Sequence, residues 1–138
     1  MLESPKTGTV AQRVFLVEPQ HAIDFSSAGL PPVLSTPSLI WFLEHAALDA
    51  ALPALEPGEI TVGVHVDVEH LAATPLGQRV TCTARLVRID GTLLSFQVEA
   101  RDEHELIARG FHKRRAVMAS RMAKRIEAKQ DPLSRQPS

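Results

Sequence analysis

Residues 59–71 read EITVGVHVDVEHL, and this stretch decides the fold. Apolar and polar residues alternate along it, which predicts a β-strand in a sheet with one buried face. Ile60 and the valines that follow it share one face, and His70 has their parity. We therefore expect the His70 imidazole to point towards whatever covers the sheet, whereas His65 points the opposite way.

The segment before this strand predicts the helix that covers the sheet. Residues 36–52 read TPSLIWFLEHAALDAAL, in which Thr36 is a candidate N-cap and Pro37 takes the first helical position. Leucine and alanine recur at steps of three and four residues, and Glu44 borders this apolar stripe. The Glu44 carboxylate and the His70 imidazole could therefore meet where the helix lies on the sheet.

The remaining segments predict an antiparallel sheet. Alternating residues and short turns, such as Asp90-Gly91, indicate strands connected by hairpins. The predicted strands are residues 9–18, 59–71, 78–89, 92–101 and 105–117. We expect an α+β domain in which an antiparallel sheet of about five strands wraps around a long central helix. Residues 19–35, rich in Pro, Ser and Gly, are expected to form a loop that closes over a site.

Length and charge suggest one domain with a basic extension. The 138 residues, 44% of them hydrophobic, suit a single domain at residues 1–117, and residues 118–138 predict a basic helix and a disordered tail. Residues 1–112 contain 7 Lys or Arg and 14 Asp or Glu, whereas residues 113–138 contain 8 and 2. The basic end could attract phosphates or balance an acidic body, but it lacks the interleaved aromatic residues of a single-strand nucleic-acid binder. We expect neither a nucleic-acid nor a membrane partner.

The single cysteine excludes an internal disulfide and a multi-cysteine metal site. Cys82 shares its parity with Val80 and Ala84, so we expect a core residue rather than a nucleophile. The chain has no apolar run of about 18 residues and no secretory signal pattern. We therefore expect a cytoplasmic protein, and no set of three convergent residues predicts a metal site.

Two motifs carry a resemblance to a known family. Residues 35–37 and 44–46 read STP and EHA, and residues 68–77 read VEHLAATPLG after Val62-Gly63. These motifs resemble those of the fluoroacetyl-CoA thioesterase family, and the order of the predicted elements resembles the hotdog fold. The resemblance extends over about residues 9–117, and its most specific part is His-x-Ala-Ala-Thr-Pro-x-Gly, which begins at His70.

The resemblance implies an activity and a site. It implies an acyl-CoA thioesterase in which Thr36, Glu44 and His70 are catalytic, Gly63 brings backbone close to the acyl group and Arg114 lies near the site. The expected substrate is a small or medium acyl-CoA, with coenzyme A as part of the substrate and no other cofactor. A homodimer, or a higher oligomer, is the expected assembly. Where the family has an aromatic lid, this chain has FSSAGL, with one phenylalanine.

Plainer explanations and other functions remain open from the sequence alone. Thr36 could be only an N-cap, Glu44 a solvated helix-edge carboxylate and His70 a hydrogen-bonded histidine at a strand end. A hydratase or dehydratase could use the same fold and an acid/base pair, and a non-catalytic module could bind acyl-CoA or an acyl-carrier protein. Within a thioesterase, the nucleophile could be Thr36, Glu44 or water.

Helix geometry adds one constraint on the predicted site. Thr36 and Glu44 are eight residues apart, so their backbones are separated by about 12 Å along one helix at 1.5 Å per residue. This distance excludes direct contact within the helix. We therefore predict a composite site, in which groups from two protomers meet at a dimer interface.

Overall fold

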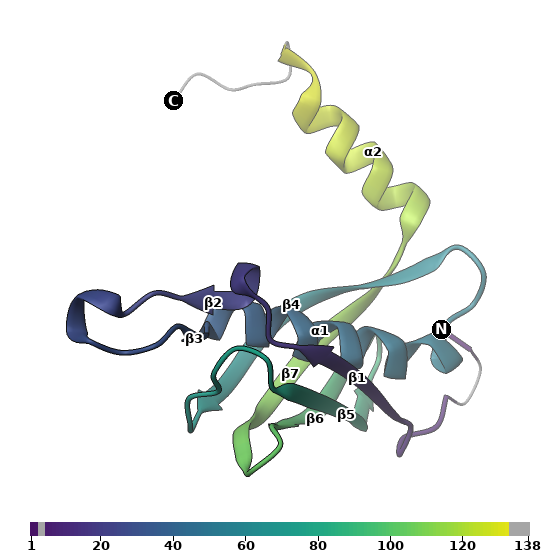
Figure 1. Cartoon of the computed structure of the whole chain (residues 1–138). Helices are drawn as coiled ribbons and strands as arrows, with labels where there is room; N and C mark the ends of the chain where they lie inside the picture. The colour runs from purple at the N-terminus through teal and green to yellow at the C-terminus, as the bar shows by residue number, and fades with distance from the viewer. Residues whose placement is uncertain (3–4, 133–138) are drawn as a thin grey trace.

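The computed structural model describes residues 1–2 and 5–132 (Figure 1). A five-stranded antiparallel sheet, in the order β1-β5-β6-β7-β4, curves around the helix α1 (Thr36–Ala51). The strands are β1 (Val10–Leu16), β4 (Glu59–His70), β5 (Arg79–Asp90), β6 (Leu93–Arg101) and β7 (Leu106–Met118). The predicted α+β architecture is confirmed, and each predicted boundary lies within two residues of the observed one.

Smaller elements complete the fold. Within the segment predicted as a loop, β2 (Ala22–Ile23) and β3 (Val33–Leu34) pair as a separate two-stranded sheet. Short 3-10 turns are η1 (Pro19–His21), η2 (Ser26–Ala28) and η3 (Leu52–Ala54), and a second helix, α2 (Ala119–Gln130), follows β7. The predicted basic helix is therefore present, whereas most of the predicted disordered tail, residues 133–138, lies outside the described residues.

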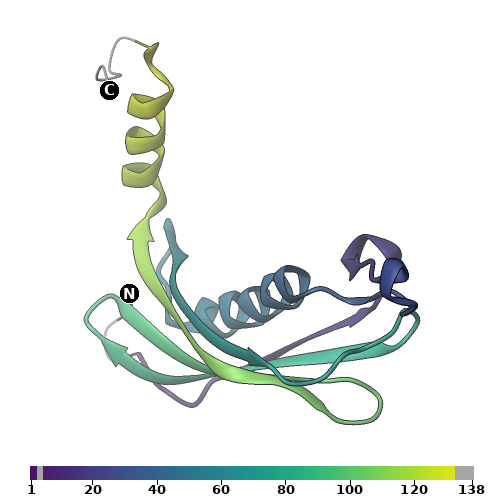
Figure 2. The ribbon, with the colours of Figure 1, turned by 90° about the vertical axis from the view of Figure 1, so that its left-hand side faces the viewer.

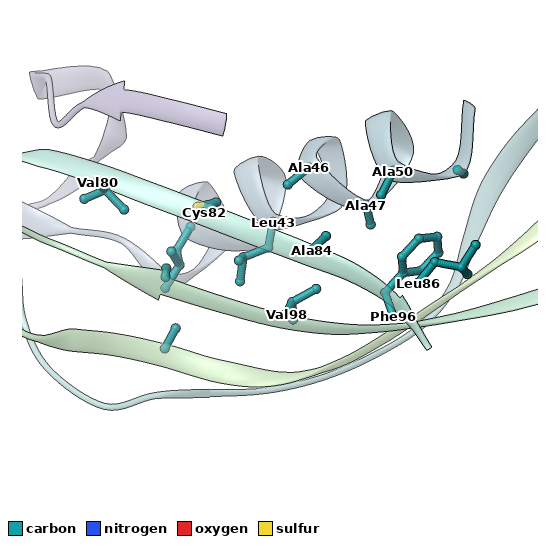
Figure 3. Packing of buried hydrophobic residues seen from close by; sticks show 14 of the residues in the cluster. Leu43, Ala46, Ala47, Ala50, Val80, Cys82, Ala84, Leu86, Phe96 and Val98 are labelled. Carbon is teal, nitrogen blue, oxygen red and sulfur yellow. The ribbon is translucent and has the colours of Figure 1, made fainter. Parts of the chain in front are cut away.

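The core lies between α1 and the sheet (Figure 3). The side chains that β5 and β6 direct towards α1 are the ones that the alternation predicts. They are Val80, Cys82, Ala84, Leu86, Leu94, Phe96, Val98 and Ala100, all at most 1% exposed. Burial raises the pKa of the Cys82 thiol to about 12, as expected for a core residue rather than a nucleophile. Small side chains on α1, at Ala46, Ala47 and Ala50, bring its backbone close to the sheet.

A β-bulge in β4 changes the predicted facing of that strand. The register with β7 shifts between Gly63 and His65. Thr61 is consequently buried and Ile60 is 38% exposed, the reverse of the predicted alternation. Beyond the bulge the predicted parity holds, and His70 turns towards α1. A bulge inserts one extra residue into a strand, so every side chain before it changes face.

The turn after β4 is fixed to the rest of the domain by buried hydrogen bonds. Thr74 is fully buried, and its hydroxyl donates to Asp102 Oδ2 at 2.9 Å. The Thr74 carbonyl accepts from the Leu34 amide at 2.8 Å, and the Gly77 amide donates to the Val17 carbonyl at 2.9 Å. Gly77 has φ 86°, a conformation that glycine adopts without strain. These residues of the AATPLG motif therefore hold the end of β4, and with it His70, in place.

Among residues 1–2 and 5–132, none of the helices combines the length and the apolar character that crossing a bilayer requires.

Candidate active site

Thr36 and His70 meet at one end of α1. The Thr36 Oγ1 atom lies 2.8 Å from His70 Nδ1, within hydrogen-bond distance. Thr36 is free for this contact because Ser35, not Thr36, is the N-cap of α1, and its Oγ accepts from the Ser38 amide at 3.3 Å. The N-cap interpretation of Thr36 is therefore wrong by one residue, and Pro37 stands at the second helical position rather than the first.

The environment of His70 favours its neutral form. The side chain is half-buried, and this burial lowers the pKa of His70 below its ordinary value, with a smaller opposing effect from the Ala72 backbone. Its second ring nitrogen, Nε2, is buried and has no hydrogen-bond partner among the described residues. If the Thr36 hydroxyl donates to Nδ1, then Nε2 carries the proton and needs an acceptor. A buried donor without a well-placed acceptor costs about 1–3 kcal/mol, so this nitrogen favours the approach of an acceptor group.

An open groove of about 420 Å³ surrounds the pair of Thr36 and His70. This volume lies within the usual range of about 300–1,000 Å³ for ligand sites. Its walls come from the β2–β3 segment and from the residues after β4, including Ile23, Phe25 and Ala72. Phe25 is 42% exposed, so it does not anchor its loop in the core. The loop therefore borders the groove without closing it.

A second cluster forms two helical turns further along α1, around Glu44 and Arg114. Arg114 is only 4% exposed, and its Nη1 lies 3.5 Å from Glu44 Oε2. Nε and Nη2 donate to the Thr61 hydroxyl and carbonyl, both at 2.9 Å. Burial lowers the pKa of Arg114, and the Glu44 carboxylate counteracts this effect. The guanidinium is thus fixed on three sides and holds the carboxylate of Glu44 beside β4.

His112 also belongs to this cluster. It is 2% exposed, and its Nδ1 lies 2.8 Å from the His65 carbonyl in the bulge of β4. Nδ1 therefore donates, which leaves Nε2 to accept from Arg114 Nη1 at 3.1 Å. Burial lowers the pKa of His112, so the neutral ring that this arrangement needs is favoured. In the sequence, His112 and Arg114 alternate with Lys113, and this alternation indicates that His112 and Arg114 share the inward face of β7.

Gly63 forms the floor of the second cluster. A Cβ at this position would lie 3.3 Å from His112 Cε1, 3.4 Å from Arg114 Nη1 and 3.5 Å from Glu44 Oε2. The absence of a side chain leaves the β4 backbone open to close approach beside the Glu44 carboxylate. The structure thus brings Gly63, Arg114 and Glu44 together.

Within one chain, the predicted site is divided between the two clusters. Thr36 and His70 form the first, whereas Glu44, Gly63 and Arg114 belong to the second. No hydrogen bond or ion pair joins Glu44 to Thr36 or His70 among the described contacts. This separation agrees with the helix geometry, which places Thr36 and Glu44 about 12 Å apart.

Comparisons with known proteins agree with this architecture. The family model for the fluoroacetyl-CoA-specific thioesterase matches residues 17–120. The fluoroacetyl-CoA thioesterase of Streptantibioticus cattleyicolor is 36% identical over 102 residues, which are 74% of this chain and 73% of that protein. The structure of the fluoroacetyl-CoA thioesterase FlK superimposes with a TM-score of 0.82 at 30% identity, covering 94% of this chain and 100% of that one. A hot-dog-like protein from Thermanaerovibrio acidaminovorans gives a TM-score of 0.81 at 26% identity, covering 92% and 94%.

The fold and these similarities define a thioester hydrolase with the hotdog fold. Because the family model spans most of the chain and a relative shares more than a third of the aligned residues, the family itself is also clear. The chain belongs to the fluoroacetyl-CoA-specific thioesterase family.

Proposed function

We propose that this protein hydrolyses short acyl-CoA thioesters at a site shared by two protomers. Thr36 and His70 come from one protomer and Glu44 from the partner subunit. The observation that carries the proposal is the 2.8 Å contact between Thr36 Oγ1 and His70 Nδ1, beside a buried Nε2 that has no hydrogen-bond partner in the described part of the chain. A hydroxyl, an imidazole and a carboxylate in series form the usual arrangement for activating an oxygen nucleophile.

The first step is attack by Thr36 on the thioester carbonyl. Oγ1 forms a bond to the carbonyl carbon while its proton passes to His70 Nδ1. The tetrahedral intermediate then collapses, the C–S bond breaks and His70 returns the proton to the sulfur of coenzyme A. Water, deprotonated by His70 in turn, attacks the ester carbon, the bond to Thr36 Oγ1 breaks, and His70 returns the proton to Oγ1 as the acid leaves. Burial of His70 supports this role because its lowered pKa keeps the ring neutral and able to accept a proton at pH 7.

The second cluster supplies the remaining charge and backbone groups. Glu44 of the partner subunit accepts a hydrogen bond from His70 Nε2–H and, remaining ionised, stabilises the imidazolium that forms during attack. Arg114 contacts that carboxylate and His112 contacts Arg114, so the two residues keep the carboxylate in position. The open backbone at Gly63 is suited to approach the acyl group closely, next to the developing oxyanion.

One of the two free edges of the sheet, the strand β4, supports a homodimer. β4 is an edge strand of 12 residues, and Ile60, Val64 and Val66 along it are 38%, 50% and 39% exposed. A long apolar edge strand readily pairs with another chain. Antiparallel pairing of two β4 strands about a twofold axis would bring the Gly63 end of one strand towards the His70 end of the other.

The substrate class follows from the groove and from the relatives. A groove of about 420 Å³ bordered by Ile23, Phe25 and Ala72 suits a short acyl group. Relatives named for fluoroacetyl-CoA act on a two-carbon acyl chain. The single phenylalanine of the loop, Phe25, leaves less aromatic cover than an aromatic lid provides, so we expect acceptance of several short acyl groups.

Thiol release from a panel of acyl-CoAs tests the proposed function. A thiol reagent detects free coenzyme A directly, and we expect turnover that is highest with two- to four-carbon acyl groups. A hydratase would consume an unsaturated acyl-CoA without releasing thiol, and a binding module would retain the ligand unchanged. Mass spectrometry after rapid quenching with a slow substrate is expected to find the acyl group on Thr36. Label on Glu44, or none with full turnover, would contradict the proposed nucleophile.

Three expectations from the sequence remain predictions. We expect a cytoplasmic protein, no cofactor besides the coenzyme A of the substrate, and neither a nucleic-acid nor a membrane partner. Fractionation of cells that express the protein would test the first, and metal analysis of the purified active protein would test the second. Binding assays with oligonucleotides and anionic vesicles would test the third.

A further inference from the structure

The helix α2 stands apart from the body of the domain. It leaves the end of β7 and extends away from the sheet (Figures 1 and 2). None of its 12 residues is buried, and Ile126 is 49% exposed. Helices of about 12–15 residues are marginal in water on their own and owe their stability to packing of an amphipathic face. A face of α2 is therefore expected to pack against something outside its own chain.

One face of α2 is suited to packing. Met118, Met122 and Ile126 follow one another at steps of four residues and line a groove of about 520 Å³ between α2 and the end of the sheet. Arg121, Arg125 and Lys129 run beside them at the same spacing. The groove therefore combines an apolar floor with a basic rim.

The position of this groove favours a second copy of the chain as its occupant. Glu59, at the start of β4, forms part of its wall. β4 is one of the two edge strands of the sheet, and a second copy pairing there in antiparallel fashion brings the far end of its own β4, which carries His70, towards the groove. In Figure 2, α2 and the β2–β3 segment rise on the same side of the sheet, at its opposite ends. A twofold rotation would therefore bring the α2 of one copy beside the β2–β3 segment of the other.

The two surfaces are complementary. The β2–β3 side presents Ile23, Phe25 and Leu71, which are 43%, 42% and 44% exposed, to the apolar face of α2. Charge favours the same contact, because residues 1–112 contain 7 Lys or Arg against 14 Asp or Glu and residues 113–138 contain 8 against 2. An acidic body attracts a basic arm from another copy.

We propose that α2 is an arm that packs on a second copy of this chain and covers the groove around that copy's Thr36 and His70. The inference rests on the proposed dimer and deepens the proposed function. Each active site then draws on its partner twice, for the carboxylate of Glu44 and for a wall formed by α2. Arg121 and Arg125 lie at the mouth of the covered groove, where they face the phosphates of coenzyme A.

Cross-linking between differently tagged chains tests this arrangement. One chain carries Met122→Cys and the other Phe25→Cys, and a short bis-maleimide joins them after mixing. The native Cys82 is 0% exposed and does not compete. The matched control is Ser120→Cys, which lies about 160° around the helix from Met122 at 3.6 residues per turn. We expect mixed cross-linked dimers with Met122→Cys and several-fold fewer with Ser120→Cys. Equal yields, or no product from a protein that is dimeric, would overturn the inference.

Kinetics separate this inference from the proposed function. Met122→Glu places a charge in the packed face, and Ser120→Glu adds the same charge on the outer side of α2. We expect Met122→Glu to raise KM for acyl-CoA several-fold and Ser120→Glu to leave it unchanged. If the unmodified protein releases no thiol, the proposed function fails while cross-linking still reports the position of α2. If the protein is active and dimeric but both substitutions behave alike, only the arm is contradicted.

Discussion

Neighbouring residues at the start of α1, Ser35 and Thr36, are expected to separate stability from catalysis. Ser35 caps the helix, and its hydrogen bond to the Ser38 amide is long at 3.3 Å. Replacing an N-cap by alanine costs about 0.5–2 kcal/mol, and the length of this bond places Ser35→Ala near the lower end, at about 0.5–1 kcal/mol. For a chain of this size that free energy corresponds to a decrease in Tm of roughly 2–4 °C.

Thr36→Val has the opposite expected profile. Valine keeps the shape of threonine but removes the hydroxyl that contacts His70 Nδ1 at 2.8 Å. The helix retains its cap, so the free energy of unfolding should change by no more than about 1 kcal/mol, the net worth of one hydrogen bond. Loss of the proton transfer between Thr36 and His70 should lower kcat/KM by about 10²- to 10⁴-fold.

Two assays decide between these roles. Urea unfolding gives the free energy for each variant, and thiol release from a short acyl-CoA gives kcat/KM. Ser35→Ala should lose stability with nearly unchanged turnover, and Thr36→Val the reverse. If Thr36→Val keeps full turnover while its stability falls as a lost cap requires, Thr36 is not part of the catalytic group.

Three further predictions concern stability and pH. Gly110→Ala should destabilise the protein by about 3 kcal/mol or more in urea unfolding, because its Cβ would lie 2.0 Å from the Asp67 carbonyl oxygen. Gly63→Ala is the control: its Cβ meets only side-chain atoms at 3.3–3.5 Å, so it should cost under about 1 kcal/mol. Because burial lowers the pKa of His70, the midpoint of the acid-side decrease in kcat/KM should lie below pH 6.5. A midpoint above pH 7 would contradict a buried neutral base. The pKa of His112 is lowered in the folded state, so its contribution to stability should be complete above about pH 6.5 and lost as the pH falls through the folded-state pKa. The free energy of unfolding should therefore differ less between pH 7 and pH 5 in His112→Asn than in the unsubstituted protein.

The core of the fold was predictable from the sequence because its signal is periodic. In β5 and β6, alternation at Val80, Cys82 and Phe96 gave the facing of each side chain correctly. In β4 the same reasoning was wrong before the bulge, because alternation does not reveal an inserted residue. Gly63 was the local sign, since a glycine inside a strand often marks a bulge or a close approach of another group.

Polar packing was harder to predict than apolar packing. Thr61 and His112 are buried polar residues that form hydrogen bonds with Arg114. Because they are polar, their burial leaves no hydrophobic pattern in the sequence. The cap was misplaced by one residue because Ser35 and Thr36 have equivalent side chains for that role, and only the three-dimensional contact with His70 distinguishes them.

In the proposed dimer, the two clusters meet only between chains. The helix rise was sufficient to show that Thr36 and Glu44 do not meet within one α1. Both outermost strands, β1 and β4, expose apolar residues, and the proposed pairing uses β4 because it brings Gly63 of one chain towards His70 of the other. The composite site is thus a prediction from sequence that the structure makes specific.

Complementation between two inactive variants tests the composite site most directly. Thr36→Val and Glu44→Gln are each expected to be inactive, and they are unfolded together, refolded at equal concentration and assayed for thiol release. If Glu44 serves the partner's Thr36 and His70, each mixed dimer has one site with all native groups. Half of the dimers are mixed and have one such site out of two, so about a quarter of the wild-type activity should return. No recovery from a mixture shown to contain mixed dimers would place all three groups in one chain and contradict the shared site.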